Sequence, residues 1–230
     1  MPVDADTYGS AEEFAVIEGA WQTLLAAEAV EVCTLWPDAI GAMRSEHDRL
    51  LRQGEWVSGR ADMLAILGRR RMELDHSAML AWVLDPRKPH GLGGAFLERI
   101  LSACWRDETF VGMEHATSDR EVSRNGARAD VVVTAPGLCL IIEVKVDAPE
   151  GDEQCESYRL QWGAEPGAKF IFLTSLGAAP ATDPKKVFRT ISWSKVRALL
   201  EDLVTERRFK NRVAEATLTQ WLNTLQSEFP

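Results

Sequence analysis

The chain has 230 residues and a formal net charge of −9, and 46% of its residues are hydrophobic and 27% are charged. This balance is ordinary for a soluble globular protein with enough apolar residues for a core, and it argues mildly against tight, non-specific binding to nucleic acid. No apolar run approaches the roughly 18 to 20 residues of a membrane span, and the acidic N-terminus lacks the pattern of a signal peptide. We therefore expect a cytoplasmic protein without a membrane partner.

The four cysteines are Cys33, Cys104, Cys139 and Cys155, which lie far apart and form no CxxC pair. Each lies in or beside an apolar segment, so neither a structural zinc site nor a disulfide framework is expected. We interpret them as small buried residues in a reducing compartment.

Helical spacing dominates the first hundred residues of the chain. Pro37 lacks the backbone N–H that a helix interior requires, so we expect it to separate two helices. Asp75 has the side chain of an N-cap, and Asp85-Pro86 is typical of a helix end. The apolar spacing and these signals predict helices over residues 11–32, 38–51, 60–72, 76–84 and 96–105.

Short apolar runs replace the helical spacing from about residue 107 onward. Asn125-Gly126 is a strong signal for the tight turn of a hairpin. The runs predict strands over residues 109–115, 119–123, 127–134, 138–146, 169–174 and 187–192, with helices over 150–162, 194–206 and 211–226. This order predicts an α/β fold of the α+β type, a mixed central sheet flanked by helices. An N-terminal helical region (1–106) would extend from and pack on a core (107–230).

The strand pair around residue 130 carries charged residues in an apolar setting. Glu143 and Lys145 point to the same side of one strand, because side chains alternate along a strand, and Asp130 lies on the neighbouring strand. Buried charges are costly unless they are compensated, and a divalent metal with a phosphate would compensate these. Mg²⁺ prefers oxygen ligands, here two carboxylates and the carbonyl of Val144. Lys145 can then orient a water molecule or stabilise the phosphate.

Asp130 followed by Glu143-Val144-Lys145 resembles the catalytic core of the PD-(D/E)XK nuclease superfamily. Ala129 precedes the aspartate where the family pattern has proline. The upstream segment from Glu73 to Leu97 resembles the helical lead-in of one uncharacterised bacterial branch, so the resemblance covers about residues 73–193. It implies a restriction-endonuclease-like fold.

The resemblance also implies roles for residues beside this motif. Glu121 precedes the Asp130 strand, at a position that helps to hold metal in many members of the superfamily. Gln154 and Tyr158, four residues apart on one face of the following helix, would face the site as further catalytic residues. Simpler explanations stay open: an exposed Glu121, a helix face that packs on the sheet, and a solvated Glu143–Lys145 pair at a strand end.

Basic and histidine side chains near these motifs have two interpretations each. The candidates for contact with a nucleic-acid backbone are Arg124, Arg128, Arg69 and Arg70, which can equally lie on solvated faces. His76, on an apolar helix, fits a hydrogen-bonded core histidine better than a catalyst. His90, before a glycine, fits a turn residue.

Function follows from the resemblance, which implies Mg²⁺-dependent hydrolysis of phosphodiester bonds, with Mn²⁺ able to substitute and with 5′-phosphate products. DNA is the expected substrate and endonuclease cleavage the expected reaction, with restriction or anti-phage defence as a role by analogy. These residues do not separate DNA from RNA, or endonuclease from exonuclease action. The alternative is a catalytically silent nuclease-fold module, or a subunit that needs a partner protein, and a homodimer is compatible with the sequence.

Overall fold

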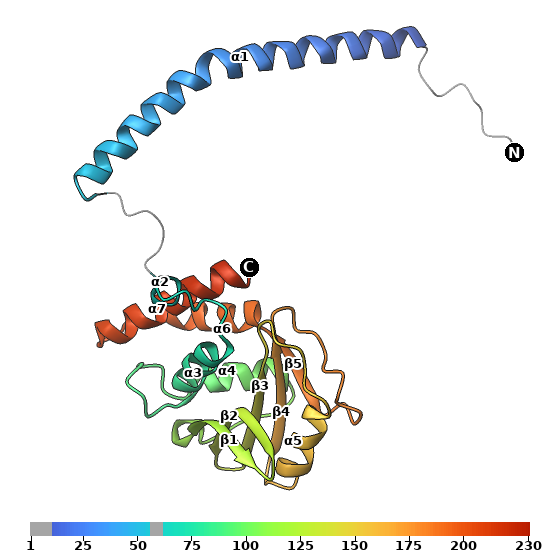
Figure 1. Cartoon of the computed structure of the whole chain (residues 1–230), viewed down its shortest axis with the longest axis vertical. Coiled ribbons are helices and arrows are strands. Elements are labelled where there is room, and N and C mark those ends of the chain that lie inside the picture. The colour runs from blue at the N-terminus through green and yellow to red at the C-terminus, as the bar shows by residue number, and fades with distance from the viewer. Residues whose placement is uncertain (1–10, 56–61) are drawn as a thin grey trace, which may run out of the picture. The chain divides into compact units, whose positions relative to one another are not determined.

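The computed structural model describes residues 11–55 and 62–230, and the chain divides into two compact units after Gly59. The first unit holds α1 (Ala11–Arg52), a single helix that continues through Pro37. The predicted break at this proline is therefore wrong. The proline removes one backbone hydrogen bond, and the helix bends instead of ending, as the curvature of α1 in Figure 1 shows.

The second unit is built on a mixed sheet, as the sequence predicted. Its described residues form five strands in the order β1-β2-β3-β4-β5, in which the first two pairings are antiparallel and the last two are parallel. The strands are β1 (Thr117–Arg124), β2 (Ala127–Ala135), β3 (Leu138–Val144), β4 (Ala168–Thr174) and β5 (Phe188–Ser192). The strand predicted over 109–115 is wrong. Gly112, with a φ of 77°, ends the extended conformation there, and a 3₁₀ turn, η2 (Met113–His115), follows.

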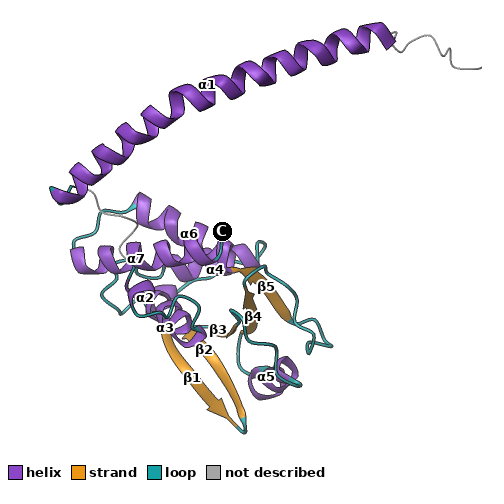
Figure 2. Cartoon of the chain, turned by 45° about the horizontal axis from the view of Figure 1, so that its top comes forward, coloured by secondary structure: helices purple, strands orange, loops and turns teal. Residues whose placement is uncertain are grey.

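Helices cover both faces of the sheet (Figure 1, Figure 2). The helices whose apolar residues join the core on one face are α3 (Glu73–Leu84), α4 (Ala95–Cys104), α6 (Trp193–Glu206) and α7 (Arg212–Glu228), and α2 (Met63–Ile66) contacts α7. The opposite face packs against α5 (Gln154–Trp162). The predicted α+β fold class is therefore confirmed.

The helices before the sheet differ from the prediction in their bounds. Between residues 62 and 72 only α2 is helical, and Gly68 follows it with a φ of 67°. The predicted positions 60 and 61 lie outside the described residues. α3 begins at Glu73, so Asp75 lies in its first turn and is not its N-cap.

α3 and α4 belong to the same compact unit as the sheet, so the division of the chain lies at Gly59 and not near residue 107. Packing explains this correction. Leu80 and Leu84 of α3 and Phe96 of α4 are buried in one cluster with the apolar residues of β2 and β3. These two helices are part of the core layer, and not a separate helical region.

The cysteines and the helices bear on two expectations from composition. Cys139 and Cys155 are buried and Cys104 is partly buried, but Cys33 is exposed on α1, so its predicted burial is wrong. All four are free thiols. None of the helices in the described ranges is both long enough and apolar enough to cross a membrane.

Candidate active site

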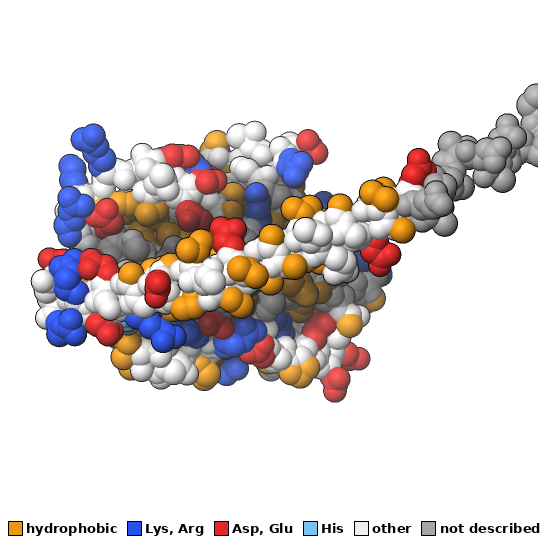
Figure 3. Space-filling view, turned by 90° about the horizontal axis from the view of Figure 1, so that it is seen from above, with side chains coloured by type: hydrophobic (Ala, Val, Ile, Leu, Met, Phe, Trp, Pro, Cys, Tyr) orange, Lys and Arg blue, Asp and Glu red, His pale blue; other side chains and the backbone are white. Residues whose placement is uncertain are grey.

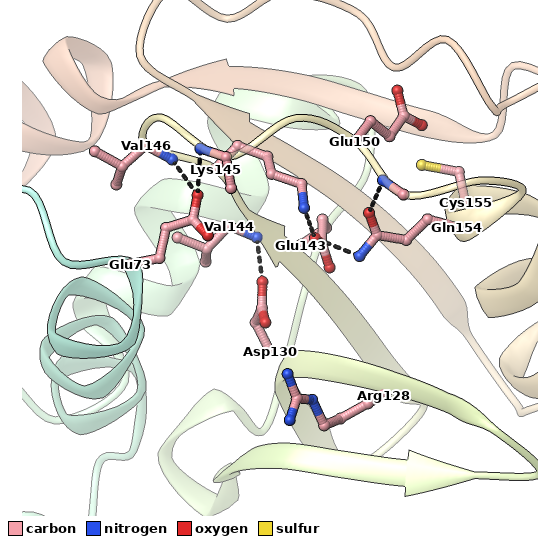
Figure 4. Close-up of polar contacts among 12 residues, drawn as sticks. Glu73, Arg128, Asp130, Glu143, Val144, Lys145, Val146, Glu150, Gln154 and Cys155 are labelled. Atoms are coloured by element: carbon pink, nitrogen blue, oxygen red, sulfur yellow. Dashed lines mark hydrogen bonds and ion pairs between the residues drawn. The ribbon is translucent and has the colours of Figure 1, made fainter.

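Asp130 and Glu143 lie at the same end of the sheet, where β2 and β3 stop pairing. The register runs to Val131 opposite Ile142, so these two acidic residues come next on their strands. Asp130 Oδ2 accepts a hydrogen bond of 2.8 Å from the backbone N–H of Val144 (Figure 4). The hairpin thus brings two carboxylates to one buried strand end.

Glu143 is only 1% exposed, and its carboxylate is the centre of a hydrogen-bonded group. Lys145, on the same side of β3, places its Nζ atom 2.8 Å from Glu143 Oε1. From α5, the Gln154 side-chain amide donates to Oε1 at 2.7 Å, and the Tyr158 hydroxyl donates to Oε2 at 2.7 Å. The strand end and α5 therefore join three polar side chains around one carboxylate.

Glu121 lies opposite Asp130 in the register of β1 and β2. Its backbone has a φ of 51°, in the left-handed region that non-glycine residues rarely adopt and that recurs at functional sites. Its Oε2 atom lies 3.2 Å from Arg128 Nη1, whereas its buried Oε1 atom has no hydrogen-bond partner among the described residues. A buried carboxylate oxygen without a partner is costly unless a cation or a donor satisfies it.

Burial and neighbouring charges shift the pKa values of Asp130, Tyr158 and Lys145. Burial raises the pKa of Asp130 to about 7, and the charges of Glu143 and Glu121 add to this rise. Burial and the Glu143 carboxylate also raise the pKa of Tyr158, so its hydroxyl keeps the proton that it donates. Burial lowers the pKa of Lys145, but the hydrogen bond and the charge of Glu143 outweigh this, and its pKa is raised. The site holds more negative charge than one lysine compensates, which is a condition that a bound cation relieves.

The donor atoms at this site fit a divalent cation. They are hard oxygens of the kind that Mg²⁺ prefers, namely the carboxylates of Asp130, Glu143 and Glu121 and the carbonyl of Val144. The partnerless Oε1 of Glu121 and the raised pKa of Asp130 both indicate uncompensated negative charge. Even so, in the part of the chain that the structure describes, no three Asp, Glu, His or Cys side chains are already gathered as a metal cluster. A cation would therefore need Glu143 to exchange some of its present partners.

The second unit of the chain matches a known family. Residues 61–223, which are more than half of the chain, match a family model described as the PD-(D/E)XK nuclease superfamily. The chain belongs to the PD-(D/E)XK nuclease superfamily. Among curated proteins and solved structures, none matches the chain significantly. Membership supports nuclease activity in general, and nucleases of this superfamily typically use divalent metals.

In this member of the PD-(D/E)XK nuclease superfamily, the turn after Lys145 is fixed by residues that we did not place at the site from the sequence. Glu73, in the first turn of α3, accepts hydrogen bonds from the backbone N–H groups of Val146 at 2.7 Å and Ala148 at 3.4 Å. The indole of Trp193 donates to the Lys145 carbonyl at 3.2 Å. The available signal for Glu73 was a glutamate that begins a mostly apolar helix within the family-like lead-in.

Two of the arginines expected to contact nucleic acid lie on the β1–β2 hairpin, in different surroundings. Arg128 is in the site, where its side chain is 64% exposed and contacts Glu121. Arg124 instead pairs with Glu165 at 2.5 Å, and its guanidinium lies 5.1 Å from the centre of the Trp162 ring. The structure therefore brings Arg128 to the carboxylates, whereas the contacts of Arg124 are with residues outside the site.

The other two arginines precede α3 and are held by acidic residues. Arg69 forms an ion pair with Asp75 at 2.6 Å, and Arg70 lies 3.5 Å from Asp62. Their side chains are nearly half exposed, so they remain accessible to solvent. Neither contacts the carboxylates of the site.

The two histidines of the lead-in segment have structural surroundings. His76 is buried, with Nε2 2.7 Å from the Arg70 carbonyl and Nδ1 accepting from the Trp221 indole at 3.2 Å, and burial lowers its pKa. His90 Nε2 lies 2.8 Å from the Asp85 carbonyl in the turn after α3. These contacts agree with a core histidine and a turn histidine.

Proposed function

We propose that this nuclease is a DNA endonuclease that hydrolyses phosphodiester bonds with Mg²⁺ and also works with Mn²⁺. The observation that supports this best is the meeting of Asp130, Glu143 and Lys145 at one end of the sheet. A cation and a phosphate together would compensate this charge set, whereas a stable core gains little from it. A role in restriction or anti-phage defence belongs to the same proposal and rests only on resemblance to bacterial proteins.

Each side chain of the site has a part in the proposed reaction. The proposed ligands of the cation are Asp130, Glu143, Glu121 and the carbonyl of Val144. When bound, the cation supplies a more acidic water molecule and relief of the phosphate charge. Lys145 keeps its proton beside Glu143 and so presents a positive charge to the phosphate. Gln154 and Tyr158 hold the Glu143 carboxylate in one orientation through their hydrogen bonds.

Cleavage assays on supercoiled plasmid, linear duplex, single-stranded DNA and RNA test this proposal, each with Mg²⁺, with Mn²⁺ and with EDTA. A closed circular plasmid has no ends, so its cleavage separates endonuclease from exonuclease action. We expect metal-dependent cleavage of the plasmid. Lys145→Ala and Asp130→Asn should each lower the rate by more than about 100-fold, because each removes charge aimed at the reacting phosphate or its cation.

Lys169→Ala is the matched control. Lys169 also pairs with a carboxylate, that of Glu108 at 2.7 Å, and its side chain is 16% exposed compared with 14% for Lys145. This variant should therefore keep its activity. The proposal fails if no divalent cation supports cleavage of any of the four nucleic acids, or if cleavage persists in both site variants.

A second candidate function is a catalytically silent module that binds nucleic acid or acts through a partner subunit. The filled contacts of Glu143, and the absence of a gathered metal cluster within the described ranges, favour it. This candidate predicts binding of duplex DNA without cleavage and no heat of Mn²⁺ binding in calorimetry. Mn²⁺ binding that Asp130→Asn abolishes would exclude it as a metal-free module.

A further inference from the structure

α1 carries an apolar stripe along one side. Six of its apolar residues follow one another at alternating steps of seven and four, namely Phe14, Trp21, Leu25, Val32, Trp36 and Met43. Eleven residues make about three turns of an α-helix, so the series stays on one side of the helix. These side chains are between 42% and 72% exposed, and Figure 3 shows apolar side chains gathered along α1.

No element in the described part of the first compact unit covers this stripe, because that part consists of α1 and the short turn after it. A single helix cannot bury its own surface. Exposed apolar surface of this extent is uncommon on proteins that act alone and marks an interaction site. α1 also lies outside residues 61–223, which match the nuclease superfamily. The proposed nuclease reaction therefore does not explain the exposed apolar stripe.

The length of the stripe argues for a partner that is itself a long helix. Leu50 lies seven residues after Met43 on the same side of the helix, so the stripe from Phe14 to Leu50 runs about 54 Å at 1.5 Å per residue. A globular unit of the size of Arg60–Pro230 is only roughly 40 Å across. The α1 helix of a second copy matches the stripe in length and in the spacing of its apolar side chains. Such a pair would bury on the order of 1,500 Å², the area of a standard stable interface.

The charges of α1 favour one direction of pairing. The chain has no lysine or arginine before Arg44, whereas Glu18, Glu28 and Glu31 lie along the earlier part of the helix. The last nine residues of α1 contain three arginines against Glu46 and Asp48, so this end of the helix is net positive by one charge. An antiparallel pair sets the basic end of one helix beside the acidic part of the other, whereas a parallel pair sets like charges side by side. We propose that α1 pairs with α1 of a second copy in antiparallel orientation and makes this protein a homodimer.

The oligomeric state of the full chain tests the proposal, measured by light scattering during size-exclusion chromatography at micromolar concentrations. Wild type should be a dimer. Val32→Glu puts a charge into the seam and should weaken the dimer by at least about 100-fold, because the charge would be buried without a partner. Val30→Glu is the matched control, since Val30 is 63% exposed and lies about 200° around the helix from Val32.

Val30→Glu should leave the dimer intact. Both valines are exposed in a single copy, so neither substitution removes a contact that folds the helix. A monomeric wild type would overturn the proposal, and so would a dimer that Val32→Glu leaves unchanged. These outcomes do not depend on whether the chain cleaves DNA.

Crosslinking through thiols tests the direction of pairing. Cys33 is exposed and lies near the middle of the stripe, so an antiparallel pair brings the two copies of Cys33 close together. A short bismaleimide should therefore link the wild-type dimer, and Cys33→Ser should abolish the link. Leu50→Cys in the Cys33→Ser background places the thiol on the stripe near its end, where only a parallel pair brings two copies together. A link through position 50, or a dimer without a link through Cys33, would overturn the antiparallel arrangement.

Discussion

At the residue scale, Asp130 carries a charge that its surroundings disfavour. Its carboxylate is partly buried near two other carboxylates, and its pKa is raised to about 7. At pH 8 in EDTA, Asp130→Asn should therefore raise the unfolding free energy by roughly 1 to 2 kcal/mol, because it removes one of several like charges. The amide oxygen can still accept the hydrogen bond from Val144. Thermal unfolding followed by circular dichroism measures the difference.

Two changes of condition make this prediction sharper. The pKa of Asp130 is higher in the folded state than in the unfolded state, so at pH values between the two the folded wild type holds a proton that the unfolded chain has lost. The wild type therefore loses stability as pH rises through about 7, where the folded state must give up this proton. The advantage of Asp130→Asn should therefore shrink at pH 6. Saturating Ca²⁺ should reverse the order, since a cation stabilises the form that binds it. Asp119→Asn, on the exposed side of β1, is the control. An equal Ca²⁺ shift in wild type and Asp130→Asn would contradict the assignment of Asp130 as a ligand.

At the scale of elements, Glu73 joins α3 to the strand end that carries the candidate site. Its carboxylate accepts hydrogen bonds from two of the backbone N–H groups in the turn after Lys145, those of Val146 and Ala148. Glu73→Ala should lower the cleavage rate constant kcat by roughly tenfold while KM changes little, because the turn would no longer hold Lys145 in place. It should cost about 1 to 3 kcal/mol of stability, the usual cost of leaving a buried donor such as the Val146 N–H unpaired. Steady-state cleavage kinetics and urea unfolding measure the two effects.

If Glu73 had only a structural role, Glu73→Ala would reduce stability without lowering kcat at a nearly constant KM. Glu73→Gln keeps an oxygen acceptor and should recover most of both losses. Asp75→Ala is the matched control, since Asp75 lies in the same helical turn and pairs with Arg69 at the surface. An unchanged kcat in Glu73→Ala would show that α3 does not position the site.

The same elements show what the sequence could predict and why. The β2–β3 hairpin could be predicted because its signals are local, and Asp130, Glu143 and Lys145 all lie within it. Glu73 could not be placed, since its contact with Val146 joins residues 73 positions apart and no local pattern encodes such a pairing.

The predicted elements were wrong where a local sequence signal is compatible with two different structures. Pro37 can end a helix or bend it, and in α1 it bends it. The apolar run at 109–115 suited a strand, but Gly112 adopts a positive φ that interrupts extended backbone. The apolar face of a helix does not reveal whether the helix packs on another helix or on a sheet. The sequences of α3 and α4 therefore did not show that these helices belong to the compact unit of the sheet, which begins after Gly59.

At the scale of the whole molecule, the net charge of −9 opposes the approach of a polyanion. Under the proposed function, DNA would therefore bind through a local region where cations outweigh the acidic background. The site offers such a region if a divalent cation neutralises its carboxylates, with Arg128 exposed beside them. Binding should consequently require a divalent cation and should weaken steeply as salt rises.

Arg128→Ala tests this account of binding. Each phosphate contact releases condensed counterions from DNA, so losing one lowers the slope of log K against log salt by about 0.9. Anisotropy of a labelled duplex, measured with Mg²⁺ across a series of KCl concentrations, gives the slope, and a Lys145→Ala background prevents cleavage during the titration. Arg124→Ala is the control, because Arg124 is on the same hairpin but its guanidinium group forms an ion pair with Glu165. Equal slopes for the two variants would show that this acidic chain holds DNA elsewhere than beside its carboxylates.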